Sequence, residues 1–232
     1  SSDISFGTTY KERTKNICAL MRNEYKLLKQ EQETVDYFRP RLLKNYIYKG
    51  PILEWYCKIK VGMEDNYKLF ESYLPKQGVI TDVGCGYGFL PLMLSFMGPQ
   101  RKITGIDYDE EKINIAANCI SKSDNLNYVC ADVTAYDYHQ SDAFVISDVL
   151  HYLSEQQQVA LITRCANKLN KNGVMIIRDA DADKKQRHWG TRYTEFFSTN
   201  TGFNKTKEGG LHFASAQLIK QTLDSLNFLS YE

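Results

Sequence analysis

The sequence predicts an α/β protein with a doubly wound, mostly parallel sheet and a helical region in front of it. Three observations predict this fold. An apolar, β-branched run at 79–83 breaks into a glycine turn and continues as a helical run at 89–97, which is typical of the start of a nucleotide-binding βαβ unit. Apolar runs of strand length then alternate with helical runs up to residue 178. From Lys11 to about Leu74 the apolar residues fall mostly at helical spacing.

The core is predicted to continue with four more strands. Short apolar runs place them at 102–106, 126–130, 143–147 and 174–178. We expect one helix over about 109–120 and a second from the capping box Ser154–Gln157 to about Leu169, ended by Asn172 and Gly173. Beyond the fifth strand the pattern predicts a helix from near Asp183, a helix over about 215–226 and a sixth strand at 228–231.

The first 75 residues are predicted to form a helical cap. Apolar spacing indicates helices at about 11–33, 35–48, 52–59 and 63–74, interrupted at Gly50-Pro51 and near Gly62. The turn at 75–78 then leads into the first strand. We therefore divide the chain into a helical region, 1–75, and a core, 76–232.

Composition excludes several classes of protein. Lys and Arg number 29 against 28 Asp and Glu, a net charge of +1, so charge gives no reason to expect a nucleic-acid partner. No apolar run in the sequence approaches the roughly 20 residues of a transmembrane helix. The six cysteines are scattered without a C-x-x-C pair, which favours reduced thiols in a cytoplasmic protein over disulfides or zinc.

The spacing of the glycines limits the class of ligand that this turn can bind. Asp82 precedes glycines at 84, 86 and 88, whereas a dinucleotide-binding G-x-G-x-x-G motif requires a third glycine at the position of Phe89. The stretch resembles motif I of the class I S-adenosylmethionine-dependent methyltransferases, (Asp/Glu)-x-Gly-x-Gly-x-Gly. The resemblance implies their Rossmann-like fold and S-adenosylmethionine as cofactor, held by Asp82, Gly84, Gly86 and Gly88. A carboxylate suits the amino group and the sulfonium of that cofactor.

Acids at the ends of the next strands extend the resemblance. Asp107 ends the second predicted strand; in the family this position accepts both ribose hydroxyls, and Tyr108 would pack on the adenine. Asp132 follows the third strand and matches the acceptor of the adenine amino group, with the backbone N–H of Val133 facing the ring. Asp148, after the fourth strand, is also assigned to the cofactor.

His151 is the candidate catalytic residue. It lies in Ser-Asp-Val-Leu-His-Tyr, 147–152, which resembles motif IV of small-molecule methyltransferases, where an Asp/Asn-x-x-His run lines the methyl-transfer site. Histidine titrates near neutral pH and so suits a general base. The alternative is that His151 only forms a wall of the pocket.

Residues after the fifth strand are candidates for the acceptor side of the cleft. Asp179, Asp181 and Asp183 alternate; they would suit Mg²⁺, but the other acids of such a site cannot be placed, so we favour turn and helix-cap roles and predict no metal. The candidate acceptor-binding residues, which would suit an anionic or aromatic substrate, are Arg178, His188, Trp189, Arg192 and Tyr193. A surface helix is the alternative for them.

A second resemblance concerns the whole chain. The segments 7–14, 45–56 and 188–213 resemble the methyltransferase module of bacterial proteins that fuse a lipid exporter, an acyltransferase and a methyltransferase. This implies that the first 30 or so residues are the tail of an acyltransferase module, at the cytoplasmic face of a membrane-bound parent, with a lipid or aryl pigment as acceptor. The acyltransferase signature His-x-x-x-x-Asp is absent at His139 and His151. No candidate follows residue 231 for the antiparallel seventh strand of the class I sheet.

These observations predict a methyltransferase that moves a methyl group from S-adenosylmethionine to a small-molecule, lipid or aryl acceptor. One alternative is an NAD-dependent oxidoreductase, which Phe89 at the third glycine position disfavours. The other is a non-catalytic S-adenosylmethionine-binding module whose helices bind a partner protein. Turnover distinguishes the methyltransferase from such a module, because the module never forms S-adenosylhomocysteine.

Overall fold

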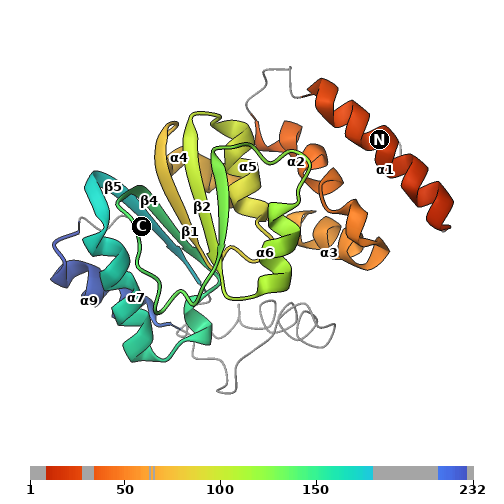
Figure 1. Ribbon diagram of the computed structural model, residues 1–232. Helices are drawn as coiled ribbons and strands as arrows, with labels where there is room; N and C mark the ends of the chain where they lie inside the picture. The colour runs from red at the N-terminus through yellow and green to blue at the C-terminus, as the bar shows by residue number, and fades with distance from the viewer. Residues whose placement is uncertain (1–8, 28–33, 63, 65, 180–213, 229–232) are drawn as a thin grey trace.

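A five-stranded parallel sheet lies at the centre of the described part of the chain (Figure 1). The computed structural model describes residues 9–27, 34–62, 64, 66–179 and 214–228. The strands are β1 (Gly78–Val83), β2 (Arg101–Asp107), β3 (Leu126–Cys130), β4 (Ser141–Ser147) and β5 (Leu169–Arg178). Their order is β3-β2-β1-β4-β5, and every pairing is parallel. The predicted doubly wound sheet is confirmed.

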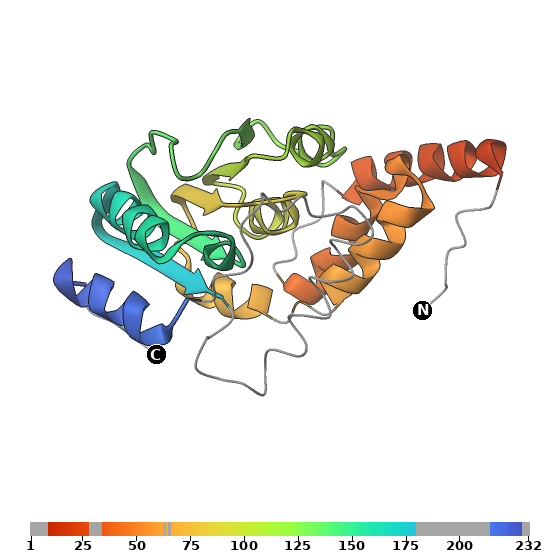
Figure 2. The ribbon, with the colours of Figure 1, turned by 90° about the horizontal axis from the view of Figure 1, so that it is seen from below.

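Helices cover both faces of this sheet. Among the described residues, four helices precede it: α1 (Tyr10–Leu27), α2 (Val35–Lys44), α3 (Pro51–Gly62) and α4 (Asn66–Tyr73), with a 3₁₀ turn η1 (Ile47–Lys49). The other described helices are α5 (Phe89–Met97), α6 (Glu110–Ala117), the 3₁₀ turn η2 (Leu150–Tyr152), α7 (Glu155–Asn167) and α9 (Ala216–Ser225). The N-terminal helices, α5 and α6 lie on one side, and α7 and α9 lie on the other (Figures 1 and 2).

The alternation of side chains along a strand explains the two cores. In β4, Ala143 and Val145 belong to the cluster beneath α5, whereas Phe144 and Ile146 belong to the cluster beneath α7. All four are fully buried, since successive side chains of a strand point to opposite faces. A strand covered on both faces therefore appears in the sequence as an unbroken apolar run, which is why these strands could be predicted.

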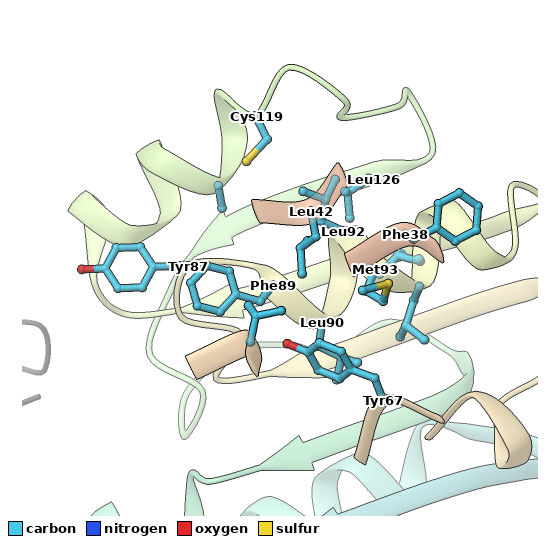
Figure 3. Packing of buried hydrophobic residues seen from close by; sticks show 14 of the residues in the cluster. Phe38, Leu42, Tyr67, Tyr87, Phe89, Leu90, Leu92, Met93, Cys119 and Leu126 are labelled. Atoms are coloured by element: carbon cyan, nitrogen blue, oxygen red, sulfur yellow. The ribbon is translucent and has the colours of Figure 1, made fainter. Parts of the chain in front are cut away.

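The helical cap shares its core with α5. Phe38 and Leu42 of α2 lie against Leu92 and Met93 of α5 (Figure 3). The hydroxyl of Tyr46, which follows α2, donates to the Tyr87 carbonyl oxygen at 2.8 Å. The cap is thus fixed directly to the glycine turn that precedes α5.

The boundary between α7 and β5 differs from the boundary that the sequence predicts. The capping box of Ser154 and Gln157 begins the helix as expected, but the helix ends at Asn167 and β5 already begins at Leu169. Asn172 and Gly173, expected to end the helix, lie inside β5. Between two paired positions β4 advances from Ser141 to Ala143 while β5 advances from Leu169 to Val174. β5 thus has extra residues between these two positions, and Asn172, whose φ is 65°, is one of them.

Other predicted boundaries shift by a few residues. The helix expected at 35–48 is divided into α2 and η1, and the one expected at 109–120 is the shorter α6, capped by the Asp109 carboxylate. The helix expected to run to 33 is described as far as Leu27, and residues 28–33 lie outside the described residues. The helix expected near Asp183 also lies outside them, as do residues 229–231 of the expected sixth strand; Phe228 itself has no strand structure.

Candidate active site

The carboxyl ends of the strands bring the predicted residues to one edge of the sheet. In the sheet, β2 and β3 lie on one side of β1, and β4 and β5 lie on the other side. The strand order therefore reverses between β1 and β4. Val83 near its end pairs with Ile106 of β2 and Ile146 of β4. Open α/β sheets bind ligands outside such a reversal. The glycine turn and the predicted acids at 107, 132 and 148 all follow strand ends at this edge.

The glycine turn has one position that faces open space. Gly84, Gly86 and Gly88 have φ of 75°, 53° and 74°, a region that L side chains rarely adopt. A Cβ on Gly84 would lie 2.2 Å from Val149 Cγ2, and one on Gly88 would lie 2.5 Å from the Tyr128 hydroxyl. A Cβ on Gly86 would meet nothing within 4 Å. Gly84 and Gly88 thus permit internal packing, whereas Gly86 lets a ligand approach the backbone.

Asp107 connects the end of β2 to this turn. Its Oδ2 accepts the Gly86 N–H at 2.8 Å, and its Oδ1 accepts the Asp109 N–H at 2.9 Å. The side chain is buried, so these bonds fix the carboxylate beside the open position of the turn. Each carboxylate oxygen has further acceptor capacity, and the predicted ribose contact remains a prediction.

Asp82 is a buried acid at the same edge. Burial raises the pKa of Asp82 to about 8, and the neighbouring Asp107 carboxylate contributes to the rise. A pKa of about 8 favours the protonated form of Asp82 at neutral pH. A cationic ligand beside Asp82 would favour its ionised form.

The residues predicted for the adenine follow β2 and β3. The Asp132 Oδ1 accepts the Thr134 N–H at 2.9 Å and the Thr134 hydroxyl at 2.7 Å, an Asx turn. Val133 is buried, and Tyr108 is exposed. Partial burial raises the pKa of the Tyr108 phenol, as do the charges of Asp107 and Asp109. Their contacts with an adenine ring remain predictions.

His151 and Asp179 form a buried pair. The His151 Nδ1 lies 2.6 Å from the Asp179 Oδ1, and both side chains are almost completely buried. The Asp179 Oδ2 accepts the backbone N–H groups of Val149, Leu150 and His151 at 3.1, 2.7 and 3.4 Å. Asp179 thus caps η2 and orients the imidazole at the same time. The sequence indicated both residues but not their pairing.

Arg178 and Asp148 contact each other and the cap. The Arg178 Nη1 lies 3.1 Å from the Asp148 Oδ2 and 2.9 Å from the Glu64 Oε2, and the Lys60 Nζ lies 3.9 Å from the Asp148 Oδ2. Burial raises the pKa of Asp148, although Arg178 and Lys60 lower it. Sequence reasoning missed Glu64 and Lys60. Glu64 stands 114 residues before its partner, and no motif marks either one.

The remaining candidate residues lie outside the described part of the chain. They are Asp181, Asp183, His188, Trp189, Arg192 and Tyr193. The turn and helix-cap roles predicted for the two acids, and the acceptor-side roles predicted for the other four residues, stay predictions.

The sheet order, the glycine turn and the acids at the strand ends fit the cofactor half of a class I methyltransferase domain. Comparison with known proteins finds similarity to the same class. Residues 80–173 match the family model described as a methyltransferase domain.

Three curated relatives align with about half of the chain or less. The "Putative methyltransferase YqeM" of Bacillus subtilis is 35% identical over 96 residues, which is 40% of this chain and 38% of the relative. The carboxy-S-adenosyl-L-methionine synthase of Helicobacter hepaticus is 25% identical over 44% of this chain and 43% of its own. The malonyl-[acyl-carrier protein] O-methyltransferase 1 of Ilyobacter polytropus is 23% identical over 52% and 46%. The chain thus spans less than half the length of these relatives.

Solved structures show the same fold. Human N-acetylserotonin methyltransferase in complex with S-adenosylmethionine superposes with a TM-score of 0.56 and 17% identity, over 96% of this chain and 64% of that one. An O-methyltransferase family 2 protein from Planctomyces limnophilus, in complex with apigenin, gives 0.53 and 18% over 69% and 51%. Residues 80–173 are therefore similar to a methyltransferase domain, and the described fold is that of the class I S-adenosylmethionine-dependent methyltransferases, a class whose cofactor is S-adenosylmethionine.

Proposed function

We propose that this chain transfers a methyl group from S-adenosylmethionine to a small-molecule, lipid or aryl acceptor. The observation that carries the proposal is one edge of the sheet, where a glycine turn open at Gly86 and the buried His151–Asp179 pair both follow strand ends. The first can hold a cofactor and the second can accept a proton. Together they supply what methyl transfer to an oxygen or nitrogen acceptor requires.

The residues at this edge fit the cofactor. The open backbone at Gly86 and the carboxylates of Asp82 and Asp107 would hold it. When bound, it supplies a methyl group on a positively charged sulfur. That charge would favour the ionised form of Asp82 and so offset the cost of burying a carboxylate there.

His151 would remove a proton from the acceptor. When its Nδ1–H donates to Asp179, the Nε2 lone pair is the basic position of the ring. Nε2 would accept the proton that an acceptor O–H or N–H group loses when it is methylated. Three backbone N–H groups donate to Asp179 and hold it beside the ring, where a carboxylate would stabilise the imidazolium.

The test measures binding first and turnover second. Thermal unfolding is followed with S-adenosylmethionine, S-adenosylhomocysteine and NAD(H). A ligand of the folded state stabilises it by about 2.7 kcal/mol at roughly a hundredfold excess over Kd. We expect a shift with the first two ligands only. Release of S-adenosylhomocysteine is then followed with phenols and lipids, the acceptor classes that the sequence predicts.

Two matched variants connect that result to the site. Asp107→Asn should weaken S-adenosylmethionine binding by about 10- to 100-fold, since it removes a charged acceptor. Asp124→Asn, an exposed acid, should not. A shift with NAD(H) alone would favour the oxidoreductase, and cofactor binding without turnover on any acceptor would favour the non-catalytic module.

A further inference from the structure

Helix α3 has two apolar faces. Leu53, Cys57 and Val61 are buried against the cap. Ile52, Trp55 and Ile59 are 70%, 53% and 39% exposed, and their i, i+3, i+7 spacing places them on one stripe of the helix. These three residues are called the α3 stripe below. Exposed apolar residues that gather on one surface, rather than occurring singly, indicate a contact site.

The surroundings of the α3 stripe are basic. The segment from η1 to the end of α3 holds Lys49, Lys58 and Lys60 but a single acid, Glu54. That acid is nearly buried and is paired with Arg13 and Lys58. On the helix, Lys58 and Lys60 lie on opposite sides of the stripe, given 100° per residue. The charged groups beside the stripe therefore favour an anionic partner.

The net charge of the chain is also positive in the helical cap and negative in the rest of the sequence. Residues 9–62 contain twelve Lys or Arg and six Asp or Glu, a net +6, whereas the chain as a whole is +1. The rest of the chain therefore carries −5. This asymmetry would orient the helical cap, rather than the sheet, toward a negatively charged surface.

We propose that α3 docks this protein on an anionic lipid bilayer, with the α3 stripe in the interfacial layer and Lys49, Lys58 and Lys60 at the lipid headgroups. A helix that lies in the interface combines an apolar face with basic flanks, and tryptophan favours that layer. Among the described residues no helix is long and apolar enough to span a membrane, so the contact is peripheral. The proposal does not depend on the proposed methyl transfer.

A second copy of the chain fits this surface less well. In a two-fold symmetric contact the same patch meets itself, so the lysines beside one stripe would face those beside the other. Like charges across an interface disfavour association. The stripe also lies near the candidate site, because Lys60 of α3 contacts Asp148 at the end of β4. Docking would place the edge of the sheet that carries the site close to the bilayer.

The experiment is co-sedimentation of the whole chain with vesicles at low and high salt. One set is pure phosphatidylcholine and the other contains about a third phosphatidylglycerol, a source of negative surface potential. We expect binding to the anionic vesicles only, reduced at least tenfold by salt because a basic surface is screened. The chain has two tryptophans, so in a Trp189→Phe background the emission of Trp55 should shift to the blue on binding.

Two double variants and one matched control locate the surface. Ile52→Ser with Ile59→Ser should abolish sedimentation, and Lys49→Glu with Lys58→Glu should reduce it at least tenfold. Leu69→Ser, which changes a 51% exposed leucine on α4, should bind like the wild type. Thermal unfolding of each variant checks that it is folded.

Three outcomes would overturn the proposal. The first is the absence of sedimentation of folded wild type with the anionic vesicles at low salt. The second is undiminished sedimentation of the folded Ile52/Ile59 variant. The third is a dimer in light scattering, without lipid, that this variant abolishes; it would assign the α3 stripe to contact between copies.

Discussion

At the residue scale, the buried carboxyl of Asp82 should make both stability and cofactor binding depend on pH. Its pKa is about 8 in the folded protein against an ordinary 3.8. Between these values the folded state binds a proton that the unfolded state releases, so the free energy of unfolding falls as the pH rises through this range. Asp82→Asn should remove that dependence, as measured by denaturant unfolding across the range.

Cofactor affinity should depend on pH in the opposite sense. A cationic cofactor favours the ionised carboxylate, so binding to the wild type should tighten as the pH rises toward about 8. Below that pH, binding should release a proton, which calorimetry in two buffers of different ionisation enthalpy detects. Asp124→Asn is the control. Equal affinity at every pH would show that Asp82 does not face the charge of the cofactor.

The His151–Asp179 pair gives a second prediction at this scale. In Asp179→Asn the carbonyl oxygen would accept the backbone N–H groups of η2, which directs the amide NH₂ at the His151 Nδ1. The ring would then carry its proton on Nε2 and could not accept another. We expect kcat to fall by about 10²- to 10⁴-fold while the Kd of S-adenosylmethionine stays within about twofold.

The tautomer can be measured without an acceptor. Nitrogen NMR of the four histidines, with His151 assigned from a His151→Gln variant, should show its proton on Nδ1 in the wild type and on Nε2 in Asp179→Asn. An unchanged tautomer with full activity would reduce His151 to a wall of the pocket, the alternative that its motif left open.

At the element scale, we expect one glycine of the turn to serve packing and another to serve ligand binding. An alanine at 84 would place its Cβ against Val149, so Gly84→Ala should lower the free energy of unfolding by about 1–3 kcal/mol. Gly86→Ala meets no neighbouring atom and should cost about 1–2 kcal/mol for its positive φ. It should nevertheless weaken S-adenosylmethionine binding more than Gly84→Ala does.

Calorimetry of folded variants checks this division. Each Kd is compared with the free energy of unfolding of the same variant. If the two variants lose affinity in proportion to their loss of stability, Gly86 has no separate role toward the ligand.

Elements were predictable where local sequence and tertiary pairing agree. The strands β1 to β4 follow from apolar runs bounded by acids or glycine, because burial on both faces requires such runs. The start of β5 did not follow. Asn172-Gly173 has the pattern of a helix end, and only the pairing of Leu169 with Ser141 shows that the strand has already begun. That pairing is long-range, so no local pattern indicates it.

At the scale of the whole molecule, the shared core of the cap and the sheet predicts one unfolding transition. Leu42 is fully buried against α5, so Leu42→Ala should lower the free energy of unfolding by about 2–5 kcal/mol. Trp55 emission, which reports on the cap, and far-ultraviolet circular dichroism should shift together. Leu69→Ala, at an exposed leucine, should change stability by less than about 0.5 kcal/mol. Separate midpoints for the two probes would mean that the cap unfolds independently.

The site was predictable as a list of residues more than as a set of contacts. Topology carries Asp107, His151 and Asp179 to one edge once the strands are recognised. Which side chains then pair depends on packing across the fold. The contact of Arg178 with Glu64 joins the end of β5 to the cap, and neither residue belongs to a motif that predicts the other.

The distribution of the site along the chain affects how the protein matures. Asp82, Asp107, His151 and Asp179 come from the ends of four different strands, so the candidate site is complete only after β1, β2, β4 and β5 have all paired. A partly synthesised or partly folded chain that lacks β5 also lacks the carboxylate that holds the histidine. S-adenosylmethionine would therefore bind only to molecules whose sheet is fully assembled. Its binding would protect these molecules, and not partly folded ones, from proteolysis.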